Sequence, residues 1–218
     1  MASLKSRAKD TAIYGMSSIV GRFLNYLLMP LYTAKIAAST GGYGVVTEVY
    51  SYTALLFVIL TFGMETTLFR FINREDERDP TRVYTTALIA VGSVGLAFIA
   101  LVLLGLRGIA GWMGYADHPS YVWVMFVTIA IDAFQCIPFA YLRYKKRPVK
   151  FAALKLLFIA LSIALNIVYY IILGGTKVGY AFYINLVCTA SITLCFWKEL
   201  RDGFFAGGKL LDAHSVNS

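Results

Sequence analysis

A few charged and polar side chains lie inside long apolar stretches of the sequence, where they could bind an ion or a substrate. Arg22 is the clearest case, because it lies near the middle of the first stretch, about 16 Å along a helix from its start. A guanidinium at that depth in a membrane costs roughly 2.5–3.5 kcal/mol unless other helices or water receive it. We therefore expect Arg22 to face other helices or a wet cavity.

Two interpretations account for a charge at Arg22. Asp132 is the only charged residue inside the fourth apolar stretch and also lies near its centre, so the two side chains could form a structural ion pair. Alternatively, Arg22 could be a cationic site in a water-filled cavity that receives an anionic substrate. Both can hold at once, since a substrate phosphate could compete with Asp132 for the guanidinium.

Other polar residues share helix faces with these two charges. Ser18, Arg22 and Asn25 follow an i, i+4, i+7 pattern, and Asp132 and Gln135 are three residues apart. A polar stripe on a membrane helix is expected to face inward. The spacing therefore nominates Asn25 and Gln135 as cavity residues beside Arg22 and Asp132.

Further polar residues lie within or at the ends of apolar stretches. Glu65 lies near the end of the second stretch, where it could form an interfacial salt bridge with Arg70, couple transport to protons or contact substrate. Glu48 lies one turn inside that stretch, and we expect it to be solvated. We expect Asn166 and Asn185 to form hydrogen bonds between helices, with cavity contacts as the alternative.

Motifs for catalysis, metal binding and cofactor binding are absent. The two histidines, His118 and His214, fall in a loop and in the C-terminal segment, and there is no P-loop, HExxH motif or nucleophile elbow. Cys136, Cys188 and Cys195 lie in apolar stretches without metal-ligand spacing. We therefore expect no enzyme activity, no metal and no cofactor.

The elements that carry these residues are predicted to be transmembrane helices. Hydrophobic residues make up 59% of the 218 residues and charged residues only 15%, whereas a soluble domain has about 25% charged residues. A helix needs roughly 20 apolar residues to cross a bilayer. Six stretches meet this requirement, at 11–34, 44–69, 82–106, 120–142, 151–173 and 178–197. The fold class is thus all-α and polytopic, with residues 1–200 as one six-helix unit and 201–218 as a polar cytoplasmic tail.

Proline and glycine support these boundaries. Pro80 follows the N-cap candidate Asp79 at the start of the third stretch, and Pro30 and Pro138 predict kinks inside spans. Glycines are expected where the chain leaves one helix for the next. They stand at Gly41 and Gly42, at Gly108 and Gly111, and at Gly174 and Gly175.

The net charge of +8 predicts orientation rather than nucleic-acid binding, because the basic residues fall in short clusters between apolar stretches. Loops on one side hold fifteen lysines and arginines, within 1–10, 70–82, 143–150 and 198–209, and those on the other side hold Lys35, Arg107 and Lys177. Positive charge in short loops favours the cytoplasmic side. Both termini are therefore expected in the cytoplasm.

Three segments carry a resemblance to a known family. They are KDTAIYGMSSIVGRFLNYLLMPLYTAKI, GGYGVVTEVYSY and FGMETTLFRFIN. Together they resemble the start of bacterial polysaccharide biosynthesis membrane proteins, the O-antigen-type flippases of the multidrug/oligosaccharidyl-lipid/polysaccharide exporter superfamily. The resemblance is strongest over residues 5–75 and continues in the helix spacing to residue 200.

This resemblance implies a transporter of twelve to fourteen helices, built as two six-helix lobes around a central cavity in the bacterial inner membrane. It would move undecaprenyl-pyrophosphate-linked oligosaccharide from the cytoplasmic to the outer leaflet by alternating access. Arg22 would attract the pyrophosphate, with Asn25 and Asp132 facing the cavity. The chain would be the N-terminal lobe, either as a fragment or paired with a second lobe or second copy.

Two other functions remain open from the sequence. A drug or small-cation exporter of the same superfamily would use Asp132 or Glu65 to bind the cation. A non-transporting membrane subunit or inactive fragment would use the polar residues only for packing.

Overall fold

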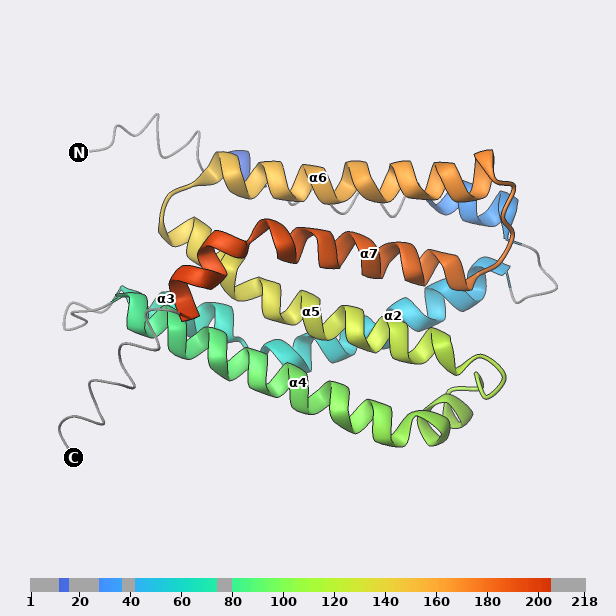
Figure 1. The fold of residues 1–218 in the computed structure, drawn as a ribbon, viewed down its shortest axis with the longest axis horizontal. Helices are drawn as coiled ribbons and strands as arrows, with labels where there is room; N and C mark the ends of the chain where they lie inside the picture. Colours follow the sequence, from blue (N-terminus) through green and yellow to red (C-terminus); the bar gives the residue numbers. More distant parts are fainter. Residues whose placement is uncertain (1–11, 16–27, 37–41, 74–79, 205–218) are drawn as a thin grey trace.

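A computed structural model describes residues 12–15, 28–36, 42–73 and 80–204 of the chain. Within these ranges the ordered elements are helices and no strand occurs. They form an elongated bundle in which the long helices run side by side (Figure 1). Of the predicted first span, only residues 12–15 and 28–34 are described, and both pieces are helical.

The second predicted span is divided into two helices, α2 (Gly42–Thr61) and α3 (Met64–Ile72). The chain breaks between them at Phe62 and Gly63, whose φ angles are 46° and 64°. Glycine adopts this left-handed conformation without strain, whereas phenylalanine does so rarely. The break matters for the site because α3 begins with the turn that carries Glu65.

Helix α4 (Pro80–Trp112) is 33 residues long and extends beyond the predicted end at residue 106. The expectation that Gly108 and Gly111 lie in a turn is wrong, because both are helical. The helix ends where Gly114 takes a φ of 79°. There the Tyr115 N–H donates to the Ala110 carbonyl at 2.7 Å and the Gly114 N–H donates to the Gly111 carbonyl at 3.1 Å. These two bonds form a Schellman motif. The helix therefore ends at the glycine whose backbone is left-handed, Gly114, and not at the helical Gly108 or Gly111.

The next helices start close to the predicted boundaries. Helix α5 (Pro119–Tyr144) and helix α6 (Pro148–Ile167) both have proline in the first turn, where its missing N–H costs nothing. Pro138 lies inside α5. Helix α6 continues into a short π-helix, η2 (Val168–Ile172), and the chain then turns at Gly174, which has a φ of 65°.

The last long helix, α7 (Gly179–Cys195), is followed by a helix at Trp197–Phe204, and the two are bent by 59°. The second helix packs on α4. The Tyr84 hydroxyl donates to the Glu199 carbonyl at 3.3 Å, and the Thr85 hydroxyl donates to the Gly203 carbonyl at 2.8 Å. Residues 201–204 of the expected polar tail belong to this helix, and 205–218 lie outside the described residues.

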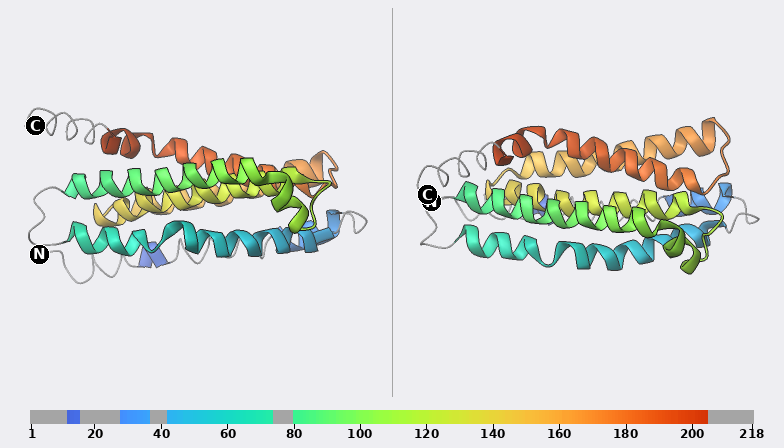
Figure 2. Two further views of the ribbon diagram at one scale, coloured as in Figure 1. Left: turned by 90° about the horizontal axis from the view of Figure 1, so that it is seen from below. Right: turned by 60° about the horizontal axis from the view of Figure 1, so that its bottom comes forward.

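Helix α5 is the central element, since it packs against α2, α4, α6 and α7. In its most apolar stretch 67% of the residues are buried, against 28% or less in the three other candidate spans. Figure 2 shows the same arrangement from two further directions. Polar residues on α5 are thus held inside the bundle.

Within the described residues, four helical stretches are long and apolar enough to cross a membrane, and the bent pair at the C-terminal side would make a fifth. The four are Gly42–Ile72, Pro80–Trp112, Pro119–Tyr144 and Pro148–Ile172. Large apolar side chains also lie exposed on the outside of the bundle, including Leu104, Leu96 and Leu101. Lipid rather than water suits such a surface. The described chain is therefore an all-α fold of the membrane type.

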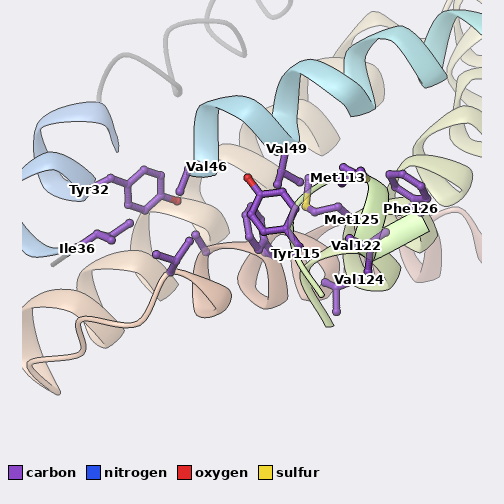
Figure 3. Packing of buried hydrophobic residues seen from close by; sticks show 14 of the residues in the cluster. Tyr32, Ile36, Val46, Val49, Met113, Tyr115, Val122, Val124, Met125 and Phe126 are labelled. Atoms are coloured by element: carbon purple, nitrogen blue, oxygen red, sulfur yellow. The ribbon is translucent and has the colours of Figure 1, made fainter. Parts of the chain in front are cut away.

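The two ends of the bundle differ in composition. One end, here called the tyrosine end, carries Tyr115, Tyr121, Tyr169, Tyr170 and Tyr180, with the rings of Tyr169 and Tyr180 stacked 4.1 Å apart. The opposite end, here called the basic end, carries Arg143, Lys145, Lys146, Arg147 and Lys150. The largest apolar cluster lies toward the tyrosine end and joins Tyr32, Val49, Tyr115, Met125 and Phe126, among others (Figure 3).

Candidate functional site

Two cavities follow one another along the bundle. The tyrosine-end cavity has a volume of about 660 Å³, and the basic-end cavity has a volume of about 480 Å³. Phe57 on α2, Asp132 on α5 and Phe158 on α6 line both. Two phenylalanine rings and one carboxylate therefore form the partition between the cavities.

The tyrosine-end cavity combines aromatic rings with hydrogen-bond acceptors. Tyr32, Tyr43 and Tyr50 line it, together with the hydroxyl-bearing residues Thr47, Ser51, Thr53, Thr128 and Ser162. Four of these hydroxyls, those of Thr47, Ser51, Thr53 and Thr128, donate to backbone carbonyls of their own helices. A hydroxyl that has donated its hydrogen can still accept a hydrogen bond from a ligand.

The basic-end cavity holds the charged side chains. Its wall includes two acidic residues, Glu65 and Asp132, and two basic residues, Arg143 and Lys155. They come from α3, α5 and α6, so three helices bring their charges to one space. Charges inside a membrane helix bundle mark candidate sites for ions or substrates.

Asp132 lies at the junction of the two cavities. Its Oδ1 atom accepts a hydrogen bond from the Thr189 hydroxyl of α7 at 3.1 Å. No ion pair involving Asp132 is formed among the described residues. Its carboxylate lines both cavities, so a ligand in either one would lie beside it.

Gln135 lies one turn farther along α5 and is buried. Its Nε2 atom donates to the Thr189 carbonyl and to the Thr193 hydroxyl, both at 2.8 Å. These bonds join α5 to α7 about one helical turn from Asp132. Gln135 thus lines the basic-end cavity and also fixes the helix that carries Asp132.

Glu65 pairs with Arg143 of α5, not with Arg70 as the sequence suggested. Arg70 follows Glu65 by five residues, so a helix of 3.6 residues per turn points the two side chains in different directions. The Arg143 guanidinium also lies 5.4 Å from the centre of the Phe69 ring and 5.8 Å from that of Phe151. The ion pair joins α3 to the end of α5.

Lys155 on α6 is a site residue that sequence reasoning missed. Its Nζ atom lies 4.0 Å from the centre of the Phe139 ring, and it interacts electrostatically with Asp132, Arg143 and Glu65. The available signal was its position inside the predicted fifth span, ahead of a long uncharged stretch. Only helix packing shows that it shares a cavity with Asp132.

The remaining sequence candidates are placed as follows. Arg22 and Asn25 lie outside the described residues. Glu48 is exposed, as expected, and accepts a hydrogen bond from the Tyr115 hydroxyl at 2.7 Å. Asn185 lines the tyrosine-end cavity. The expected interhelical bond of Asn166 is confirmed, because its side chain hydrogen-bonds that of Tyr32. Its amide nitrogen also donates to the Ser162 carbonyl of its own helix at 2.8 Å.

Neither metal binding nor a known relative defines the site. In the described part of the chain, no group of three or more histidine, cysteine, aspartate or glutamate residues could hold a metal ion. The chain matches no protein-family model, no curated protein and no solved structure. The function must therefore be argued from the two cavities and their charges.

Proposed function

We propose that the chain is the N-terminal lobe of a membrane transporter that moves a lipid-linked oligosaccharide, with undecaprenyl pyrophosphate as the lipid carrier. The observation that carries this proposal is the pair of cavities that meet at Asp132 in the middle of the bundle. Alternating access requires a site that can open first to one side of the membrane and then to the other. A partition of two rings and one carboxylate suits such a site.

The chemistry of the cavities matches the two polar parts of this substrate. Phosphate groups need cations, and the basic-end cavity contains Arg143 and Lys155. Sugar hydroxyls need hydrogen-bond partners and aromatic faces, and the tyrosine-end cavity supplies both. In this proposal Arg22 adds a cation to the pathway, with Asn25 beside it. No covalent reaction is required.

The proposal includes an arrangement in the membrane. The chain would cross the bacterial inner membrane six times, and its basic end would lie in the cytoplasm, together with both termini. Lys145, Lys146, Arg147 and Lys150 lie where α5 ends and α6 begins, at that end of the bundle, and positive charge in short loops favours the cytoplasmic side. A second six-helix lobe or a second copy of this chain would complete the transport pathway.

Transport in liposomes tests this function. The purified chain is reconstituted with a fluorescent undecaprenyl-pyrophosphate disaccharide, and dithionite quenching measures how much of it reaches the outer leaflet. We expect faster exchange than in empty liposomes and at least about tenfold slower exchange for Arg22→Ala, since this variant removes a charged contact worth about 1.5–3 kcal/mol. Asp117→Asn, in an exposed loop, is the control. Exchange no faster than in empty liposomes contradicts transport by paired copies of this chain.

A second candidate function is export of an organic cation. The described residues that line the tyrosine-end cavity include five aromatic rings and one carboxylate, Asp132, but no lysine or arginine. The rings are those of Tyr32, Tyr43, Tyr50, Phe57 and Phe158. Aromatic faces and a carboxylate bind ammonium groups. Ethidium efflux that depends on Asp132, without lipid exchange, would favour this function. Inactivity in both assays would favour a non-transporting membrane subunit.

A further inference from the structure

The basic-end cavity contains two cations in different electrostatic situations. Arg143 already forms an ion pair with Glu65 and lies between the rings of Phe69 and Phe151. A phosphate would have to compete with a carboxylate for this guanidinium. Arg143 is therefore better suited to hold the cavity together than to receive a substrate.

Lys155 forms no such ion pair among the described residues, although its ammonium interacts electrostatically with Asp132 and Glu65. None of the ion pairs among the described residues includes it, and its ammonium rests on the face of the Phe139 ring, 4.0 Å from the ring centre. A cation–π contact is weaker than a charge-assisted hydrogen bond to a phosphate oxygen. The Lys155 ammonium can thus exchange the ring for an incoming phosphate at a net gain.

Asp132 determines where along the pathway that phosphate stops. Its carboxylate lies at the junction of the cavities and repels a like charge. The described lining of the tyrosine-end cavity contains no lysine or arginine that would offset this repulsion. An anion is therefore favoured on the Lys155 side of the partition and opposed on the other side.

We propose that Lys155 binds a phosphate of the substrate in the basic-end cavity. This inference rests on the proposed transport of a pyrophosphate-linked lipid. It names the phosphate-binding residue of the described chain and places the phosphates on the cytoplasmic side of Asp132. The three N–H donors of the ammonium can bond phosphate oxygens without a fixed geometry. This suits a substrate phosphate that must also be released from the cavity.

Binding of geranyl pyrophosphate to the full chain in detergent tests the proposal, with geraniol as the ligand that lacks phosphate. Lys155→Met is expected to weaken geranyl pyrophosphate binding at least about tenfold, as loss of a charge-assisted hydrogen bond does. Lys155→Arg is expected to retain most of it. Lys145→Met is the matched control, because Lys145 also rests on tyrosine rings, 5.2 Å from the centre of Tyr141, but is exposed outside the cavity.

A second measurement uses the unaltered protein, so it does not depend on whether a variant folds. Geranyl pyrophosphate should slow acetylation of Lys155 by acetic anhydride, read by mass spectrometry, and leave acetylation of Lys145 unchanged. Wild-type binding that Lys155→Met leaves intact, or unprotected Lys155, overturns this inference alone. Failure of the wild-type chain to bind geranyl pyrophosphate more tightly than geraniol overturns the inference and the proposed function together.

Discussion

The Glu65 carboxylate accepts a hydrogen bond from the Arg143 guanidinium, although the two residues are 78 positions apart in the chain. The pair links the short helix α3 to the end of α5, and both residues line the basic-end cavity. Both side chains are partly exposed, at 40% for Glu65 and 33% for Arg143. The Glu65–Arg143 pair therefore joins two helices and can also be reached from the cavity.

The Glu65–Arg143 pair is expected to contribute a measurable coupling energy. Partly exposed ion pairs are worth about 0.2–1 kcal/mol, so Glu65→Gln and Arg143→Met should each lower the free energy of unfolding. The double variant should lose less than the sum, by about 0.5–1 kcal/mol. Unfolding by SDS titration measures this. Arg70→Met, an exposed change on the same helix, should be close to neutral, and strict additivity of the two site variants would contradict the coupling.

Cysteine accessibility should report the basic-end cavity directly. Cys136 lines that cavity, whereas Cys188 is fully buried. Because thiol labelling requires access, a water-soluble maleimide should modify Cys136 and spare Cys188, in a Cys195→Ala background that removes the exposed thiol.

The same experiment tests orientation and occupancy. In sealed vesicles, labelling of Cys136 should be faster when the reagent is on the basic-end side of the membrane, and geranyl pyrophosphate should slow it. Equal labelling from both sides, or modification of Cys188 at the rate of Cys136, would show that the cavity does not open as described.

Helix boundaries could be predicted from the sequence where proline and charged residues near the same position indicated the same boundary. Helix α5 begins and ends within two residues of the predicted span 120–142, because proline starts it and a basic cluster follows it. The end of α4 was misplaced because Gly108 and Gly111 are helical, and only backbone conformation distinguishes them from Gly114. The break at Phe62 could not be read either, since phenylalanine rarely takes a positive φ.

The site residues divide in the same way. Asp132 and Gln135 could be nominated from one helix face, which depends only on spacing within a helix. The pairing of Glu65 with Arg143, and the place of Lys155 beside Asp132, depend on how three helices are rotated against each other. Such rotation is fixed by packing across the bundle, so no local pattern in the sequence reveals it.

Tyr115 should stabilise the tyrosine end in a pH-dependent way. Burial and then the hydrogen bond to Glu48 raise the pKa of Tyr115 in the folded chain. A raised pKa favours the protonated form, so this stability is present below about pH 10, the unfolded value, and is lost as the pH rises toward the folded value.

Tyr115→Phe should cost about 0.5–1.5 kcal/mol at pH 8, as loss of one hydrogen bond does. It should also reduce the loss of stability above pH 10, measured by SDS unfolding at a series of pH values. A Tyr115→Phe variant as stable as wild type at pH 8 would contradict the role of this bond.

The carboxylate of Glu199 should hold the C-terminal helix Trp197–Phe204 against the basic end. Its side chain is 7% exposed, and its Oε1 atom lies 2.5 Å from Lys150 Nζ and 4.0 Å from Arg147 Nη1. Breaking a buried ion pair leaves a charge without its partner. Glu199→Gln should therefore loosen the helix by about 1–2 kcal/mol, which corresponds to amide exchange about five- to thirtyfold faster.

Hydrogen exchange measured by mass spectrometry over residues 197–204 checks the Glu199 prediction. Asp202→Asn is the control on the same helix, because Asp202 is exposed and contacts only the exposed Arg201, at 3.8 Å, among the ion pairs of the described residues. We expect it to leave exchange unchanged. Because Tyr84 and Thr85 also hold the helix through its backbone, Glu199→Gln should speed exchange without exposing α4. Equal exchange in the Glu199 and Asp202 variants would mean that these backbone contacts alone hold the C-terminal helix in place.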